Sequence, residues 1–62
     1  MSHATLPEIL REKARGCELN AVAKADAGNE TAGNGFLVAA IVLHEVADAV
    51  EQAETDVGER AA

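Results

Sequence analysis

Residues 36–43 form an unbroken run of apolar side chains, Phe-Leu-Val-Ala-Ala-Ile-Val-Leu, in an acidic chain of 62 residues. A helix through this run is apolar on every side for about two turns, whereas one partner helix covers only a single stripe of such a surface. A chain of this length buries only about 60% of the surface that it exposes when unfolded. We therefore expect the run to be covered by more protein than one chain supplies.

Small domains are usually stabilised by disulfides, a metal or oligomerisation. Cys17 is the only cysteine, so a disulfide within the chain is impossible. His3, Cys17 and His44 are the only histidine and cysteine side chains, which is a poor supply of ligands, and we expect no metal and no other cofactor. Oligomerisation remains, and the apolar run supplies a surface for it.

The first half of the chain is predicted to be a helix over about residues 6–27. Thr5 and Glu8 have the spacing of a capping box, in which each side chain binds the backbone amide of the other residue. Leu19 lies off the apolar stripe of this helix, with Val22 beside it, and is a candidate for a second contact surface. The stripe itself, spaced by three or four residues, consists of Leu6, Leu10, Ala14, Cys17, Ala21 and Ala25.

A loop is predicted over residues 28–35, where three glycines and two asparagines occur, with Gly28 in the left-handed position after the first helix. The second helix is expected over about residues 35–57, with Asn34 as its cap and Gly58 as its end. Its predicted contact line with the first helix has the a/d heptad spacing. This line consists of Phe36, Ala39, Leu43, Val46, Val50, Ala53 and Val57, and Ala40 and Ala47 widen it.

These elements predict an all-α fold, an antiparallel helical hairpin that forms a single domain over residues 1–62. Further apolar side chains of the second helix are surplus to a two-helix fold, so we expect two hairpins to dimerise into a four-helix bundle with two-fold symmetry. Whether this surface serves self-association or target binding stays open. The predicted protein interface consists of Phe36, Leu37, Val38, Ile41, Val42 and Glu45.

The predicted layout resembles that of small two-helix proteins such as the plasmid copy-number regulator Rop, a dimer of helical hairpins. The likeness is one of layout alone. It implies a homodimer, but RNA binding is not expected here because this chain lacks a basic face.

No arrangement typical of an active site is found, and no catalytic residue is expected. His44, Glu45 and Asp48 resemble the HExxH pattern of zinc proteases with Asp in place of the second His. A surface His44 that pairs with Asp48 one turn later is the simpler interpretation. Cys17 lies on the apolar stripe and is expected to be a small buried residue rather than a reactive thiol.

The net charge of −6 argues against direct binding of nucleic acid and of an anionic membrane surface. The apolar run is too short to cross a bilayer, and no signal peptide is recognised, so a cytoplasmic location is expected. The C-terminal half of the second helix is acidic. Its carboxylates are Glu45, Asp48, Glu51, Glu54, Asp56 and Glu59.

The sequence favours a small non-enzymatic regulatory or inhibitory protein. It would act as a homodimer and bind a larger, unidentified protein through an apolar helix face. Two alternatives remain open. One is a purely structural dimerisation module, and the other is an acidic mimic of nucleic acid that blocks a DNA- or RNA-binding protein.

Overall fold

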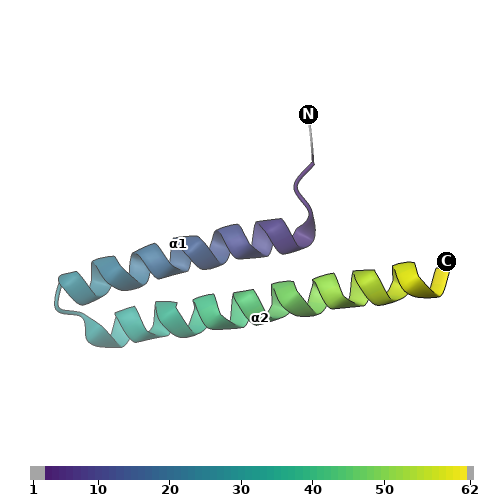
Figure 1. Cartoon of the computed structure of the whole chain (residues 1–62). Coiled ribbons are helices and arrows are strands. Elements are labelled where there is room, and N and C mark those ends of the chain that lie inside the picture. The colour runs from purple at the N-terminus through teal and green to yellow at the C-terminus, as the bar shows by residue number, and fades with distance from the viewer. Residues whose placement is uncertain (1–2, 62) are drawn as a thin grey trace.

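The protein is described by a computed structural model that covers the backbone of residues 3–61 and the side chains of residues 3–59. Two antiparallel helices, α1 (Leu6–Asp26) and α2 (Glu30–Ala61), are joined by a short turn (Figure 1). The described backbone contains no strand. The predicted all-α helical hairpin is therefore confirmed. The single domain predicted over residues 1–62 extends beyond the described residues at both ends and stays a prediction.

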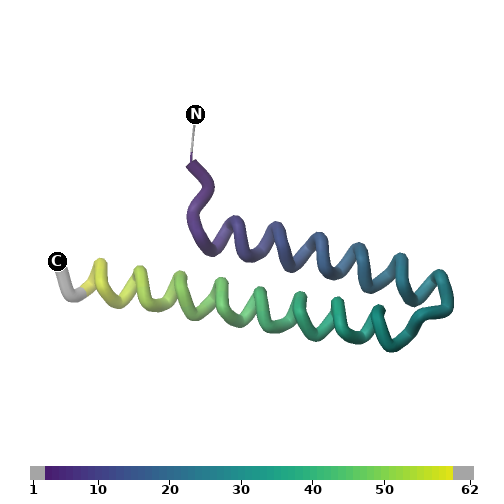
Figure 2. Tube along the Cα trace, turned by 180° about the vertical axis from the view of Figure 1, so that it is seen from behind, coloured from purple at the N-terminus to yellow at the C-terminus, as the bar shows by residue number. Residues whose placement is uncertain are grey.

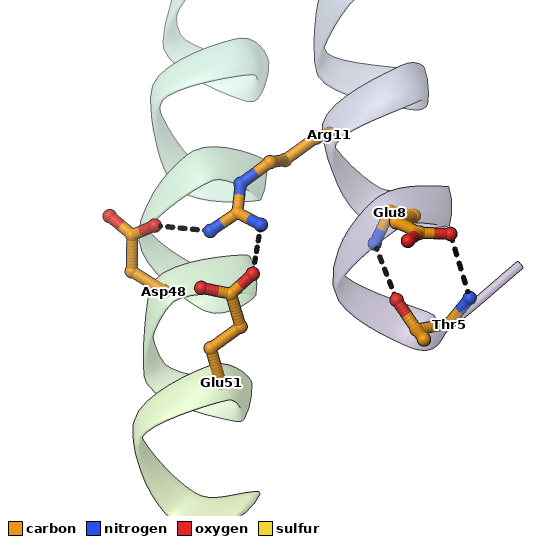
Figure 3. A network of polar contacts seen from close by, with 5 residues as sticks. All are labelled: Thr5, Glu8, Arg11, Asp48 and Glu51. Atoms are coloured by element: carbon orange, nitrogen blue, oxygen red, sulfur yellow. Dashed lines mark hydrogen bonds and ion pairs between the residues drawn. The ribbon is translucent and has the colours of Figure 1, made fainter. Parts of the chain in front are cut away.

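A capping box starts α1 at the predicted place. The backbone amide of Glu8 donates to Thr5 Oγ1 at 3.4 Å, and the amide of Thr5 donates to Glu8 Oε2 at 3.1 Å (Figure 3). Pro7 lies in the first turn, where its missing amide removes no helical hydrogen bond. These local interactions fix the start of α1 independently of its partner helix.

The turn between the helices is shorter than the predicted loop over residues 28–35. Gly28 has φ +85°, the left-handed conformation expected after a helix, and the amide of Asn29 donates to the carbonyl of Lys24 at 2.8 Å. The side chain of Asn29 then accepts a hydrogen bond from the amide of Ala32 at 3.1 Å. Asn29 therefore caps α2, and the predicted cap, Asn34, lies inside the helix.

The end of α2 also differs from the prediction. Gly58 was expected to end the helix near Val57, but α2 continues to Ala61. A glycine in a helix costs only about 1 kcal/mol relative to alanine, which is too little to stop a helix by itself.

The two helices meet through small residues at every seventh position. A Cβ atom placed on Gly33 would lie 3.1 Å from the carbonyl oxygen of Ala21, so the helices approach closely near the turn. We call these residues the small-residue seam. It consists of Pro7, Ala14 and Ala21 in α1 and Gly33, Ala40 and Ala47 in α2, all of them buried.

The predicted contact line of α2 is wrong at its centre. Ala40 and Ala47, which were expected only to widen the line, are its buried middle. Val46 is 43% exposed and Val57 is 65% exposed. Small side chains bring the helix axes so close together that no room is left between them for leucine or valine, and the large residues are displaced to the sides.

The stripe predicted for α1 needs a similar correction at both of its ends. Leu6 is exposed, and the neighbouring Pro7 is buried in its place. Ala25 is also exposed, whereas Ala14 and Ala21 are buried as expected.

The C-terminal end of α2 extends past the start of α1 (Figures 1 and 2). The ion pairs of Arg11 with Asp48 and Glu51 show the register of the two helices. By this register Leu6, five residues before Arg11, lies level with residues 53–56 of α2. Residues 57–61 of α2, about one and a half turns, therefore have no α1 beside them, and we call them the overhang.

Candidate protein-interaction surfaces

One flat side of the hairpin carries ion pairs between the helices. The guanidinium of Arg11 donates to Asp48 Oδ1 at 2.8 Å and also to Glu51 (Figure 3). Nearer the turn, His44 Nε2 lies 2.9 Å from Glu18 Oε1. We call this the polar side. The predicted pairing of His44 with Asp48 is wrong, because each of these residues has a partner on α1 instead.

The ion pairs shift the acid–base properties of the polar side. The hydrogen bond from Arg11 holds the pKa of Glu51 below its ordinary value of about 4.5. The same hydrogen bond, together with that to Asp48, raises the pKa of Arg11. Among the side chains that the structure describes, no three His, Cys, Asp or Glu residues are grouped as they would be around a metal ion.

The opposite side of the hairpin follows from the positions of these ion pairs. An α-helix turns by about 100° per residue, so a residue four places after a seam residue is rotated about 40° one way, and a residue three places after it about 60° the other way. Arg11, Glu18, His44 and Glu51 all stand four places after seam residues and lie on the polar side. Residues three places after a seam residue are rotated the other way. They therefore lie on the side of the hairpin opposite the ion pairs, in both helices.

Large apolar residues occupy this second side, which we call the apolar face. Its members are uncharged, and all are half-buried except Val46, which is exposed. Lys24, three places after Ala21, is exposed at the end of the face beside the turn. Leu6 of α1, one place before Pro7, extends the face and is exposed as well, whereas Ile9 stands two places after Pro7 and lies on the outer edge of α1. The apolar face consists of Leu10, Cys17, Phe36, Leu43, Val46 and Val50.

Cys17 belongs to this face rather than to a closed core. It was expected to be fully buried, but it is a free, half-buried thiol. The small-residue seam lies beside it, so Cys17 is covered on one flank only.

The residues of the predicted protein interface do not form one surface. Phe36 lies on the apolar face, whereas Leu37 and Ile41 lie on the polar side near the turn, four places after Gly33 and one place after Ala40. Val38 and Val42 stand two places from Ala40, which rotates them by about 160° to the outer edge of α2. The four aliphatic residues outside the apolar face are between 48% and 59% exposed. Glu45 is exposed as well.

A shallow groove of about 440 Å³ lies between the helices beside the turn. Val22 and Leu37 face it from the two helices, and both are exposed. Val22 had been noted in the sequence only as a residue off the main stripe. The groove is lined by Glu18, Ala21, Val22, Ala25, Glu30, Gly33, Asn34 and Leu37.

The acidic half of α2 is partly neutralised by α1. Asp48 and Glu51 both bind Arg11. Glu54, Asp56 and Glu59 are exposed and take part in none of the ion pairs between the described side chains. Glu54 and Asp56 lie level with the first turn of α1 and Glu59 lies in the overhang, so these three carboxylates gather near the open end of the hairpin.

Within the described chain, α2 is the one helix that is long and apolar enough to cross a membrane by length and composition. A window of 18 residues within Glu30–Glu59 has a mean hydropathy of 1.4, and 17% of that window is buried. The prediction that the apolar run is too short to cross a bilayer considered residues 36–43 alone. It did not include the apolar residues on either side of the run. A core helix of a soluble protein meets the same criteria.

Comparison with known proteins finds no matching family model, no matching curated protein and no matching solved structure. The interpretation of these surfaces therefore rests on the geometry of the chain itself.

Proposed function

We propose that this chain is a small, non-enzymatic regulatory or inhibitory protein of the cytoplasm that works as a homodimer and binds a larger protein. The observation that supports this proposal is the amount of large apolar surface left outside the hairpin. Leucine, isoleucine, valine and phenylalanine side chains lie on both flat sides and on the outer edge of α2, while the interior contains mainly alanine. Exposed apolar patches of this kind are typical of protein-binding surfaces.

The surface offered to a larger protein lies beside the turn. Leu37 and Ile41 of α2 and Val22 of α1 are exposed there, and the groove between the helices adjoins them. An amphipathic helix or an extended peptide with apolar side chains is the kind of segment that such a groove accepts. The carboxylates of Glu18 and Glu30 at the groove favour a segment with basic residues at its margin.

The test compares three forms of the full chain as baits in lysate of the native host. We expect the double substitution Leu37→Glu and Ile41→Glu to lose proteins that the unchanged chain retains, because the buried apolar contacts with the target are removed. Ala49→Glu, an exposed position on the outer edge of α2, serves as the matched control and should retain them. Circular dichroism checks that all three are equally helical. Identical sets of retained proteins for all three forms would count against target binding at this place.

The open end of the hairpin supports a second candidate function, an acidic mimic of nucleic acid. Glu54 and Asp56 lie level with the first turn of α1 and Glu59 lies beyond it, and none of the three takes part in an ion pair between the described side chains. Binding by mimicry should weaken steeply with salt, because it depends on charge. Binding that is insensitive to salt would favour the apolar groove, and no retained protein at all would favour the purely structural dimerisation module.

A further inference from the structure

We infer that the apolar face is covered by a second copy of this chain, stacked face to face and antiparallel, so that the overhang of each copy lies over the turn of the other. This inference rests on the homodimer of the proposed function. It assigns the dimer contact to Leu10, Cys17, Phe36, Leu43, Val46 and Val50. Most of the interface predicted from the sequence is thereby left outside the contact.

The exposed area of the chain is the first support for a second copy. A compact monomer of 6.4 kDa exposes about 3,800 Å². The hairpin exposes 4737 Å², an excess of about 900 Å². Each partner in a stable protein–protein interface contributes roughly 800 Å². The excess therefore matches the area that one copy would bury in a dimer.

The shape and chemistry of the face are the second support. The chain is a flat hairpin, with extents of 52 × 26 × 8 Å for its Cα atoms, so one broad side can meet another over its length. A two-fold contact requires the same patch on both copies. The six residues of the apolar face are uncharged and would meet an identical apolar surface, with the exposed Lys13 and Lys24 of α1 at its margins. Stacked in this way, the two hairpins form a four-helix bundle.

The charges at the two ends of the face set the orientation. Lys24 stands three places after Ala21, so it continues the line of Leu10 and Cys17 towards the turn. Glu54 stands between Val50 and Val57 on one stripe of α2, level with the start of α1. An antiparallel stack brings Lys24 towards the partner's Glu54. A parallel stack would place like charges opposite each other at both ends and leave the two overhangs with only each other to contact.

The antiparallel stack separates self-association from target binding. Val38 and Val42 lie on the outer edge of α2, and Leu37 and Ile41 lie on the polar side. All four remain accessible when the apolar faces meet. A dimer of this kind would present two copies of the groove beside the turn, one at each end of the bundle.

The first test compares neighbouring substitutions on the two surfaces. Leu43→Glu places a charge in the apolar face, and Val42→Glu places the same charge on the outer edge. We expect sedimentation equilibrium to give a monomer mass for Leu43→Glu, with a dissociation constant raised at least tenfold, and a dimer mass for the unchanged chain and for Val42→Glu. A dimer mass for Leu43→Glu, or an equal loss for both substitutions, would overturn the assignment.

A milder substitution at the same position distinguishes loss of the dimer contact from loss of folding in Leu43→Glu. Leu43→Ala keeps the helix-forming tendency of the position and removes only apolar area. We expect it to remain helical at high concentration and to dissociate at a higher concentration than the unchanged chain. A dissociation constant equal to that of the unchanged chain would contradict the inference.

Cross-linking tests the orientation. In a chain with Cys17→Ser, the pair Lys24→Cys and Glu54→Cys should give covalent dimers with a short bis-maleimide linker, and Glu54→Cys alone should not. Dimers from Glu54→Cys alone would show the parallel arrangement and overturn the antiparallel one. Retention of host proteins by the monomeric Leu43→Glu chain would leave the target-binding proposal standing by itself, so the two proposals fail separately.

Discussion

The small-residue seam and the apolar face lie side by side in the hairpin and differ in almost every respect. The seam is buried and consists of alanine, glycine and proline, whereas the face is only half-buried and consists mainly of leucine, valine and phenylalanine. Fully burying a large aliphatic side chain contributes about 1.5–3 kcal/mol, and alanine contributes much less. The chain therefore uses its smallest residues to bring the helices together and leaves its most stabilising ones at the surface.

This difference shows what the hairpin is suited for. A seam of small residues permits close backbone packing but supplies little of the free energy that a marginal domain of this size needs. The larger residues supply that free energy only when another surface covers them. Folding and association should therefore be coupled, and the following substitutions separate the two contributions.

The largest effect is expected from enlarging the seam. Ala47 is fully buried between the helices, so Ala47→Leu should force the helices apart and cost about 1–3 kcal/mol or more, as overpacking does. Ala49→Leu, on the exposed outer edge of the same turn, is the control and should be close to neutral. Urea denaturation followed by circular dichroism measures both. Equal midpoints for the two variants would show that the seam is not closely packed.

A smaller effect is expected where the seam reaches the turn. Gly33 and Gly35 both lie in α2, and replacing either by alanine gains up to about 1 kcal/mol of helix propensity. The Cβ of Gly35→Ala would have open space, but that of Gly33→Ala would lie 3.1 Å from the carbonyl oxygen of Ala21. We expect Gly35→Ala to raise the thermal midpoint and Gly33→Ala to leave it unchanged or lower it. The same rise for both would contradict the close approach.

The smallest effect is expected on the polar side, where the ion pairs are exposed. The hydrogen bond from Arg11 lowers the pKa of Glu51 in the folded chain. The resulting stabilisation is fully present above the unfolded pKa of about 4.5 and is lost as the pH falls through the lower folded pKa. Glu51→Gln should therefore be slightly less stable than the unchanged chain at pH 7, and the two should converge once the pH has fallen below the lowered folded pKa of Glu51.

High salt provides the control for this pH experiment. Exposed ion pairs are screened, so the difference between Glu51→Gln and the unchanged chain should shrink in about 1 M salt. The contribution of the apolar face should persist or increase under the same conditions. A difference that stays constant over pH and salt would mean that Glu51 acts through packing.

Much of the fold followed from local patterns in the sequence. The capping box of Thr5 and Glu8 and the left-handed Gly28 were predicted at the residues where they occur. The start of α2 was placed too late, because Gly33 and Gly35 were taken as loop residues. Gly33 instead lies within α2, where the close approach of Ala21 leaves little room for a side chain, so the reason for a glycine there is visible only in the packed hairpin.

The interaction surfaces were harder to predict, because the choice between them depends on how closely the helices approach. The large residues of α2 have heptad spacing and were assigned to the contact with α1. The small residues have heptad spacing as well. Pro7, Ala14 and Ala21 are seven residues apart in α1, and Ala40 and Ala47 are seven residues apart in α2. That matched pair of small-residue heptads was the signal for the seam. Once the seam is identified, the heptad of large residues must face outwards.

The overhang of α2 should make the rigidity of this protein depend on its concentration. In an isolated chain, these last turns have no neighbour beside them, and their amide hydrogens should exchange with solvent almost as fast as those of a free peptide. A second copy covers these turns only when the protein concentration is high enough for the dimer to form. At low concentration the overhang would then be flexible and accessible to proteases. At high concentration the overhang would be rigid like the rest of the hairpin.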